Sequence, residues 1–315
     1  MARWAVAMVV AMLTAVLCLS AQQPATNSPE QDCSRQTIPL TVLKSVGSPW
    51  DWHSLNLTVA GRQVPIQSMS ATTQPPRVLV LVDTSGSMAS HFGGGGRPNW
   101  GVGLRTAAFA VDATPLDSSV SLGTFNERDK FGQFESRQAA AKDLVALAQE
   151  EPRHRTALYD ALKDAATQFQ PAEFGDTIFL VTDGGNNHSV ELQKRVQQEL
   201  MARGIRVFVF LVTDKDFKTQ EEREAPDDMW EVANVTGGAL VQADWSKQWV
   251  ASDEAKKMVQ QIRTMVRWPY QLQFKLDQPL QKPGKLKITP PDKRSLDLSY
   301  PHEVLPCLAL AAKSH

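Results

Sequence analysis

Cysteine is scarce in this chain, with only three among 315 residues. That is too few for a disulfide-built scaffold. Neither sign of charge is in excess, because 33 lysines and arginines are balanced by 34 aspartates and glutamates. A balanced charge gives no general electrostatic footprint for nucleic acid, which usually requires a basic domain or stripe. With 42% hydrophobic residues, the chain is long enough to bury a core in one large domain or two modest ones.

An apolar run that approaches the length of a membrane span occurs only at the start of the sequence. A short positive region at Arg3 precedes an uncharged apolar run over residues 4–19, and the small residues Ser20 and Ala21 follow. This layout is typical of a secretory signal peptide, so we expect residues 1–21 to be removed and the mature protein to be secreted or periplasmic. The alternative is an uncleaved membrane anchor, for which the run is short against the ~20 residues that span a bilayer. We expect no other membrane span.

Export changes the meaning of the cysteine count. Removal of the signal peptide takes Cys18 away and leaves Cys33 and Cys307, near the two ends of the mature chain. An exported protein meets an oxidising compartment, which makes these two cysteines a candidate pair. We therefore predict a disulfide between Cys33 and Cys307. The alternative is two unpaired thiols in flexible tails.

The two ends of the mature chain share one strand pattern. Apolar and polar residues alternate within residues 37–74 and again within residues 269–307. Such alternation is typical of half-buried strands in antiparallel sheets with one wet face. We expect these segments to pack together as one small β domain. Residues 22–36 are polar and predict a flexible leader, and residues 308–315 are expected to form a tail.

The middle of the chain has a different pattern. The segments RVLVLV (77–82), TIFLV (177–181) and RVFVFLV (206–212) are continuous apolar runs. Such runs fit central parallel strands covered by helices on both faces, and apolar stripes at helical spacing lie between them. The alternation of strand and helix over residues 75–268 predicts an α/β fold with a doubly wound, mostly parallel, Rossmann-like sheet. We expect this domain to be inserted between the two β segments.

Oxygen-bearing side chains follow the predicted central strands. The first strand ends in VDTSGSM, which contains Asp83, Ser85 and Ser87, and another ends in VTDGGNN, which contains Asp183. Thr156 lies immediately before a predicted helix. Ligand sites in open α/β sheets lie beyond the carboxyl ends of the strands, so these five side chains are expected to converge. Two carboxylates and three hydroxyls predict a site for Mg²⁺, with Mn²⁺ or Ca²⁺ as alternatives.

The same residues resemble a known motif. The D-T-S-G-S sequence that starts at Asp83, the threonine that opens T-A-L-Y-D-A-L, and T-D-G around Asp183 resemble the metal-ion-dependent adhesion site (MIDAS) of von Willebrand factor type A domains. All five motif positions are present and in order, and the resemblance covers roughly residues 75–268. The flanking β segments also resemble the layout of exported acidobacterial proteins related to that family.

The resemblance implies a role in protein–protein interaction or cell adhesion. In such a site Ser85, Ser87 and Thr156 approach the metal, while Asp83 and Asp183 hold it directly or through water. Neutral hydroxyls leave the cation electrophilic, so that an acidic side chain of a partner protein completes the coordination shell. Taken one at a time, the same residues are also compatible with an ordinary turn, a helix cap and a loop.

Further residues are candidates for a partner-binding rim around this site. They are Arg97 and Trp100 in a glycine-rich loop, Asn126, Glu127 and Asp129 after another predicted strand, and Asn186 after the second aspartate. The alternatives are a tolerated insertion for the loop and solvated surface charge for the acidic residues.

Two other functional classes are considered. A metal-dependent hydrolase or phosphatase of the haloacid-dehalogenase type requires a second aspartate where Ser85 stands, and the sequence has neither a phosphate-binding loop nor a G-x-S-x-G elbow. A structural envelope subunit is the third class, in which a metal only braces loops. We predict a binding module and not an enzyme, with a protein ligand and no nucleic acid as partner.

Overall fold

The computed structural model describes most of the chain beyond the predicted leader. The described residues are 32–45, 51–89, 99–212, 220–243, 245–267, 269–292 and 296–307. The predicted signal peptide, most of the predicted leader and the predicted tail therefore lie outside the described residues. Across these ranges, no helix has both the length and the apolar content that a membrane span requires.

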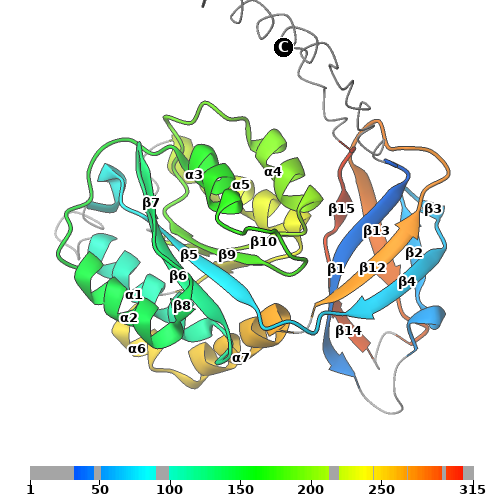
Figure 1. Ribbon diagram of the computed structural model, residues 1–315, viewed down its shortest axis with the longest axis horizontal. Helices are drawn as coiled ribbons and strands as arrows, with labels where there is room; N and C mark the ends of the chain where they lie inside the picture. Colours follow the sequence, from blue (N-terminus) through cyan, green and yellow to red (C-terminus); the bar gives the residue numbers. More distant parts are fainter. Residues whose placement is uncertain are drawn as a thin grey trace, which may run out of the picture. The chain divides into compact units, whose positions relative to one another are not determined.

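A seven-stranded sheet forms the centre of the α/β part (Figure 1). Its strands are β5 (Arg77–Asp83), β6 (Ser119–Phe125), β7 (Asp129–Phe131), β8 (Glu135–Ser136), β9 (Thr177–Thr182), β10 (Arg206–Leu211) and β11 (Leu240–Gln242). The order is β11-β10-β9-β5-β6-β7, with β8 off this path. Read from β7 and numbered along the chain, these six strands have the 3-2-1-4-5-6 order of a doubly wound sheet. β7 and β8 pair antiparallel with β6, and the other pairs are parallel. The predicted fold class is confirmed.

Helices cover both faces of this sheet. They are α1 (Asn99–Ala113), α2 (Arg137–Leu147), α3 (Leu158–Thr167), α4 (Gln193–Ala202), α5 (Gln220–Thr236), α6 (Lys247–Val250) and α7 (Asp253–Arg267). Val78, Val80 and Val82 of β5 belong to a buried cluster with α1, α2 and α7. Leu79 and Leu81 belong to a second cluster with α3, α4 and α5. Both faces are covered, which explains why the central strands are continuously apolar.

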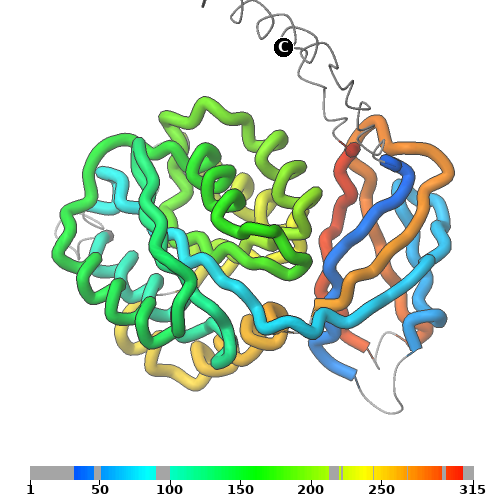
Figure 2. The backbone as a smooth tube through the Cα atoms, viewed as in Figure 1, coloured from blue at the N-terminus to red at the C-terminus, as the bar shows by residue number. Residues whose placement is uncertain are grey.

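The two chain ends form the flanking β part. One antiparallel sheet has the order β14 (Leu296–Ser299), β1 (Arg35–Ser45), β12 (Tyr270–Lys275), β4 (Ile66–Ala71). The other has the order β15 (Glu303–Val304), β13 (Gly284–Thr289), β2 (Asn56–Val59), β3 (Arg62–Gln63). β12 pairs with β1 and β4, and β13 pairs with β2, so each sheet contains strands from both ends of the chain (Figure 2). This confirms the expected small β domain.

A disulfide joins the ends of this β part. Cys33 and Cys307 are bonded, with their Cα atoms 5.4 Å apart and a sequence separation of 274. The predicted disulfide is therefore confirmed. β1 begins at Arg35, so the last two residues of the range expected as leader are part of a strand.

Arg206 fixes the end of α7, where the chain returns to the β part. The side chain is fully buried, and its guanidinium donates hydrogen bonds to the carbonyl oxygens of Met265 (2.6 Å) and Val266 (3.0 Å) and to Thr177 Oγ1 (3.3 Å). Burial lowers the pKa of Arg206 to about 9. A cation is favourable at a helix C-terminus. Thr41 of β1 donates to the same Met265 oxygen at 3.5 Å, so both parts of the chain meet there.

Candidate functional site

The loop after β5 carries the first three predicted metal ligands. Asp83, the last residue of β5, is fully buried; its Oδ1 accepts a hydrogen bond from Ser85 N at 2.8 Å and its Oδ2 accepts one from Thr182 Oγ1 at 2.7 Å. Ser85 is also fully buried, and its Oγ lies 3.0 Å from Ser87 Oγ. The carboxylate is thus held from two sides while the two serine hydroxyls lie next to each other.

Asp183 brings a second carboxylate to this edge from the neighbouring strand. It follows β9 directly, is half-buried, and its Oδ1 accepts a hydrogen bond from Gly185 N at 3.2 Å. Burial, and next the charge of Asp183, raise the pKa of Asp83 to about 7, although hydrogen bonds from Ser85 and Thr182 act in the opposite direction. The two carboxylates are therefore close enough to repel each other, and a bound cation relieves such repulsion.

Thr156 links the loop after β5 to the loop after β9. It is buried, its N donates to Asn187 Oδ1 at 3.0 Å, and its carbonyl accepts from the N atoms of Asn187 (3.1 Å) and His188 (3.0 Å). On the other side, the His154 carbonyl accepts from Gly86 N at 2.9 Å. Three segments that are distant in the sequence are therefore joined at the carboxyl edge of the sheet.

The Thr156 hydroxyl is not used as a helix cap. The N-cap position of α3 is occupied by Ala157, and no side-chain hydrogen bond caps the helix from that residue. Within the described residues, the Thr156 hydroxyl makes no hydrogen bond. The helix-cap alternative for Thr156 is thus not what the structure shows, and its hydroxyl is available to a ligand.

The donor set fits a hard cation. The edge offers two carboxylates, Asp83 and Asp183, and the hydroxyls of Ser85, Ser87 and Thr156. In the part of the chain that the structure describes, no three or more His, Cys, Asp or Glu side chains are grouped for a metal. The five predicted ligands at this edge all offer oxygen atoms and only two are charged, which suits Mg²⁺ with retained water better than Zn²⁺.

The predicted rim residues have mixed environments. Arg97 lies outside the described residues. Trp100 is half-buried at the start of α1 and packs against the core cluster of that face, and its Nε1 has no hydrogen-bond partner among the described residues. Asn126 Nδ2 donates to Thr84 Oγ1 at 3.4 Å, so this side chain lies beside the loop after β5.

The two acidic rim residues differ in their surroundings. Glu127 pairs with Arg155, whose Nε lies 3.0 Å from Glu127 Oε1, and this hydrogen bond lowers the pKa of Glu127. Asp129 is half-buried in β7, and burial raises its pKa, to which the neighbouring carboxylates of Asp164 and Asp160 add. The charge of Glu127 is thus already balanced, whereas Asp129 faces other acids.

The loop after Asp183 caps α3 from outside the helix. Asn186 Oδ1 accepts hydrogen bonds from Leu158 N at 3.2 Å and from Ser189 Oγ at 2.5 Å, and Ser189 Oγ accepts from Tyr159 N at 2.9 Å. Asn187 has a similar role, because its Oδ1 accepts the hydrogen bond from Thr156 N. Sequence reasoning missed this role. The only signal for it was the Asn-Asn pair after Asp-Gly-Gly, because its partner lies 31 positions away.

Asn186→Ala should therefore destabilise the chain modestly. It removes the acceptor for Leu158 N, and loss of such a helix cap costs about 1 kcal/mol. The free energy of unfolding in urea measures the effect, with the exposed Asn56→Ala as the matched control. Equal stabilities of Asn186→Ala and the control would contradict the capping role.

Comparisons with known proteins identify no family for this chain. No family model matches the sequence, and no curated protein matches it. An aerotolerance-related membrane protein from Bacteroides fragilis NCTC 9343 has a similar fold, at 22% identity and a TM-score of 0.43, over 59% of this chain and 98% of that one. A von Willebrand factor type A structure from Catenulispora acidiphila is similar at 12% identity and a TM-score of 0.45, over 89% of this chain and 75% of that one.

A third solved structure has metal in a MIDAS motif. It is proximal thread matrix protein 1 from the mussel byssus, with zinc in that motif, at 15% identity and a TM-score of 0.46, over 64% of this chain and 49% of that one. Identities of 12–22% and TM-scores of 0.43–0.46 are too low to transfer a ligand or a partner to this chain. The fold class of the present chain rests on the strand order and helix layers described above.

Proposed function

We propose that this chain is an exported protein-binding module that captures an acidic group of a partner protein through a Mg²⁺-type cation. The observation that carries the proposal is the convergence of Asp83, Ser85, Ser87, Thr156 and Asp183 at the carboxyl edge of one parallel sheet. Their order and spacing resemble the MIDAS of von Willebrand factor type A domains.

The residues of this edge divide into two roles. Asp83 and Asp183 would hold the cation directly or through water, and the three hydroxyls would complete the protein's share of the ligands. When bound, the cation supplies an electrophilic position that a carboxylate of a partner can occupy. Thr182 has a positioning role, because its hydroxyl donates to Asp83 and accepts from Gly184 N at 2.9 Å.

Export is part of the proposal. The Cys33–Cys307 disulfide is of the kind that persists in oxidising compartments, and the predicted signal peptide agrees with it. Absence of catalysis is also part of the proposal. The contact of Ser85 Oγ with Ser87 Oγ at 3.0 Å, in place of a histidine, supports this part of the proposal.

A capture experiment tests the proposal. The full chain is immobilised and exposed to the envelope and secreted fractions of its host, in Mg²⁺ and in EDTA. We expect a protein that is retained in Mg²⁺, released by EDTA, and lost with Asp83→Ala but not with the exposed control Asp143→Ala. Retention that is equal in EDTA would contradict the proposal.

Two further readouts separate the alternative classes. Turnover of a phosphate ester that Asp83→Ala abolishes would indicate a hydrolase. A metal that raises the melting temperature while no partner depends on it would indicate a structural subunit.

A further inference from the structure

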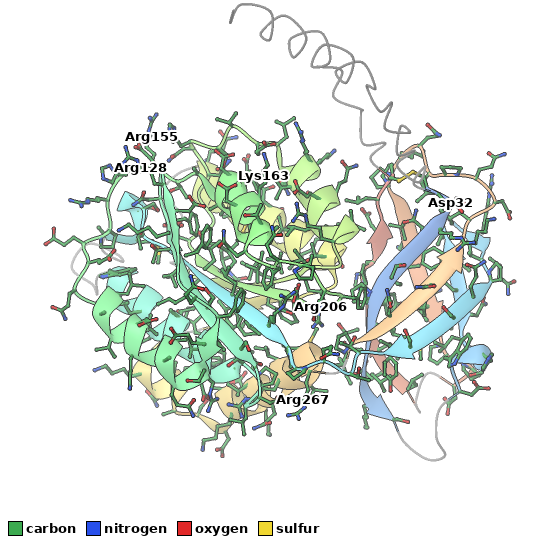
Figure 3. The ribbon with its side chains drawn as sticks, in the orientation of Figure 1. Asp32, Arg128, Arg155, Lys163, Arg206 and Arg267 are labelled. Carbon is green, nitrogen blue, oxygen red and sulfur yellow. A yellow bond between two sulfur atoms is a disulfide. The ribbon has the colours of Figure 1, made fainter. Side chains whose placement is uncertain are left out.

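A cavity adjoins the predicted metal edge. Its volume is about 700 Å³, within the range of known ligand pockets. One wall is formed by the turn after β6, with Arg128, and by β7, with Lys130. The other wall is the segment that follows α2, with Glu150, Glu151 and Arg153. We call this cavity the charged cleft. Figure 3 shows Arg128 at one end of the α/β part and Arg206 near the other.

The charged cleft shares a wall with the predicted metal ligands. Thr84 lines the cleft, although its neighbours Asp83 and Ser85 belong to the metal edge. The Thr84 carbonyl accepts a hydrogen bond from Arg153 N at 2.9 Å, and its hydroxyl donates to Phe125 O at 2.9 Å. Only one stretch of backbone therefore separates the cleft from the carboxylate of Asp83. A partner chain bound at the predicted metal edge would therefore place its neighbouring residues next to the cleft.

Five of the charged side chains that line the cleft form no ion pair within the described residues. Arg128, Lys130, Arg153, Glu150 and Glu151 are all exposed, and none of them forms an ion pair with another described residue. Glu127, which also lines the cleft, is instead paired with Arg155. Exposed charges of both signs in one cavity are complementary to a ligand that also carries both signs.

The neutral lining indicates which class of ligand this is. Thr84, Thr124, Asn126 and Gln149 provide uncharged hydrogen-bonding groups between the charges. A peptide offers N–H and C=O groups to such a lining and can carry both charges on its side chains. A nucleic acid carries only negative charge, so Glu150 and Glu151 would repel it.

We infer that the charged cleft binds the segment of the partner protein that adjoins its metal-bound acidic residue. This segment carries a lysine or arginine for Glu150 and Glu151, and a second acidic residue for Arg128, Lys130 and Arg153. The inference rests on the proposed metal-dependent capture of an acidic group, and it names the sequence class of the partner.

A selection experiment tests the inference. A library of randomised, display-bound peptides is selected on the immobilised full chain in Mg²⁺ and in EDTA. We expect enriched peptides to combine acidic residues with a nearby lysine or arginine. With the double variant Glu150→Lys/Glu151→Lys, the basic preference should disappear, and the best wild-type peptide should bind at least about tenfold more weakly.

Two variants serve as controls. Glu135→Lys/Glu254→Lys changes the net charge equally at exposed sites outside the cleft and should leave the selection unchanged. Arg128→Glu/Lys130→Glu should instead remove the preference for the second acidic residue. This second cleft variant keeps the test decisive if the first one fails to fold.

The outcomes separate the inference from the proposed function. Enrichment of acidic residues in Mg²⁺ without a basic preference, or a selection unchanged by both cleft variants, would overturn the inference and leave the proposed function standing. If the peptides selected on the wild-type chain showed no preference for acidic residues that depends on Mg²⁺, the proposed function would be overturned. The link between the cleft and the metal would then be overturned too. A library that yields no enriched peptide would overturn both.

Discussion

Asp83→Asn is expected to weaken Mg²⁺ binding on the order of 100-fold. Asparagine has the size of aspartate, and its Oδ1 can still accept the hydrogen bond from Ser85 N that Asp83 accepts at 2.8 Å. The substitution therefore removes a charge from a fully buried position with little change in shape. Because only two of the five predicted ligands are charged, loss of one carboxylate removes half of the negative charge at the edge.

Titration calorimetry of the metal-free chain with Mg²⁺ measures this effect. Asp183→Asn should weaken binding in the same direction, whereas Asp143→Asn, at an exposed position of α2, should bind like the wild type. Circular dichroism spectra establish that each variant is folded. If Asp83→Asn bound Mg²⁺ as tightly as the wild type, the edge would not be the metal site.

The stability of the metal-free chain should rise as the pH falls from about 8 to about 5. Burial and the charge of Asp183 raise the pKa of Asp83 from 3.8 to about 7. Above pH 7 the folded chain contains a destabilised carboxylate, which the unfolded chain exposes to water without that cost. As the pH falls through 7, the folded chain binds a proton that the unfolded chain takes up only near pH 4. Asp83 should therefore add on the order of a few kcal/mol to the free energy of unfolding.

Comparison with Asp83→Asn isolates this contribution from that of all other titrating groups. Urea unfolding in EDTA at a series of pH values should give a wild type that gains stability relative to Asp83→Asn as the pH falls. A constant difference between the two chains from about pH 8 to about pH 5 would show that the pKa of Asp83 is not raised. Added Mg²⁺ should stabilise the wild type more at the higher pH, because protons compete with the metal.

The sequence was sufficient to predict the strands whose carboxyl ends form the candidate metal site. β5, β9 and β10 could be predicted because they are buried on both faces and therefore continuously apolar. The insertion could be predicted because strands with one wet face alternate apolar and polar residues. Asp83, Ser85, Ser87, Thr156 and Asp183 could be named because the ends of parallel strands and the loops beside them share one edge of the sheet.

Interactions between distant loops could not be predicted. Thr182 donates to Asp83 across 99 positions, and nothing around a threonine at the end of a strand indicates that partner. The apolar stripe of α1 does not show whether Trp100 at its start packs inward or outward. The charged cleft depends on the approach of Arg128 and Glu150, which belong to two segments without a common motif.

The disulfide determines where tension would travel through the molecule. Cys33 and Cys307 enclose nearly all described residues, and the α/β part lies between them in the sequence. A pull applied between the segment before Cys33 and the segment after Cys307 would pass through the sulfur–sulfur bond. The strands and the predicted metal edge would carry none of this load while the bond is intact. After reduction, the same pull would act first on β1 and β15, which lie next to the two cysteines in the sequence.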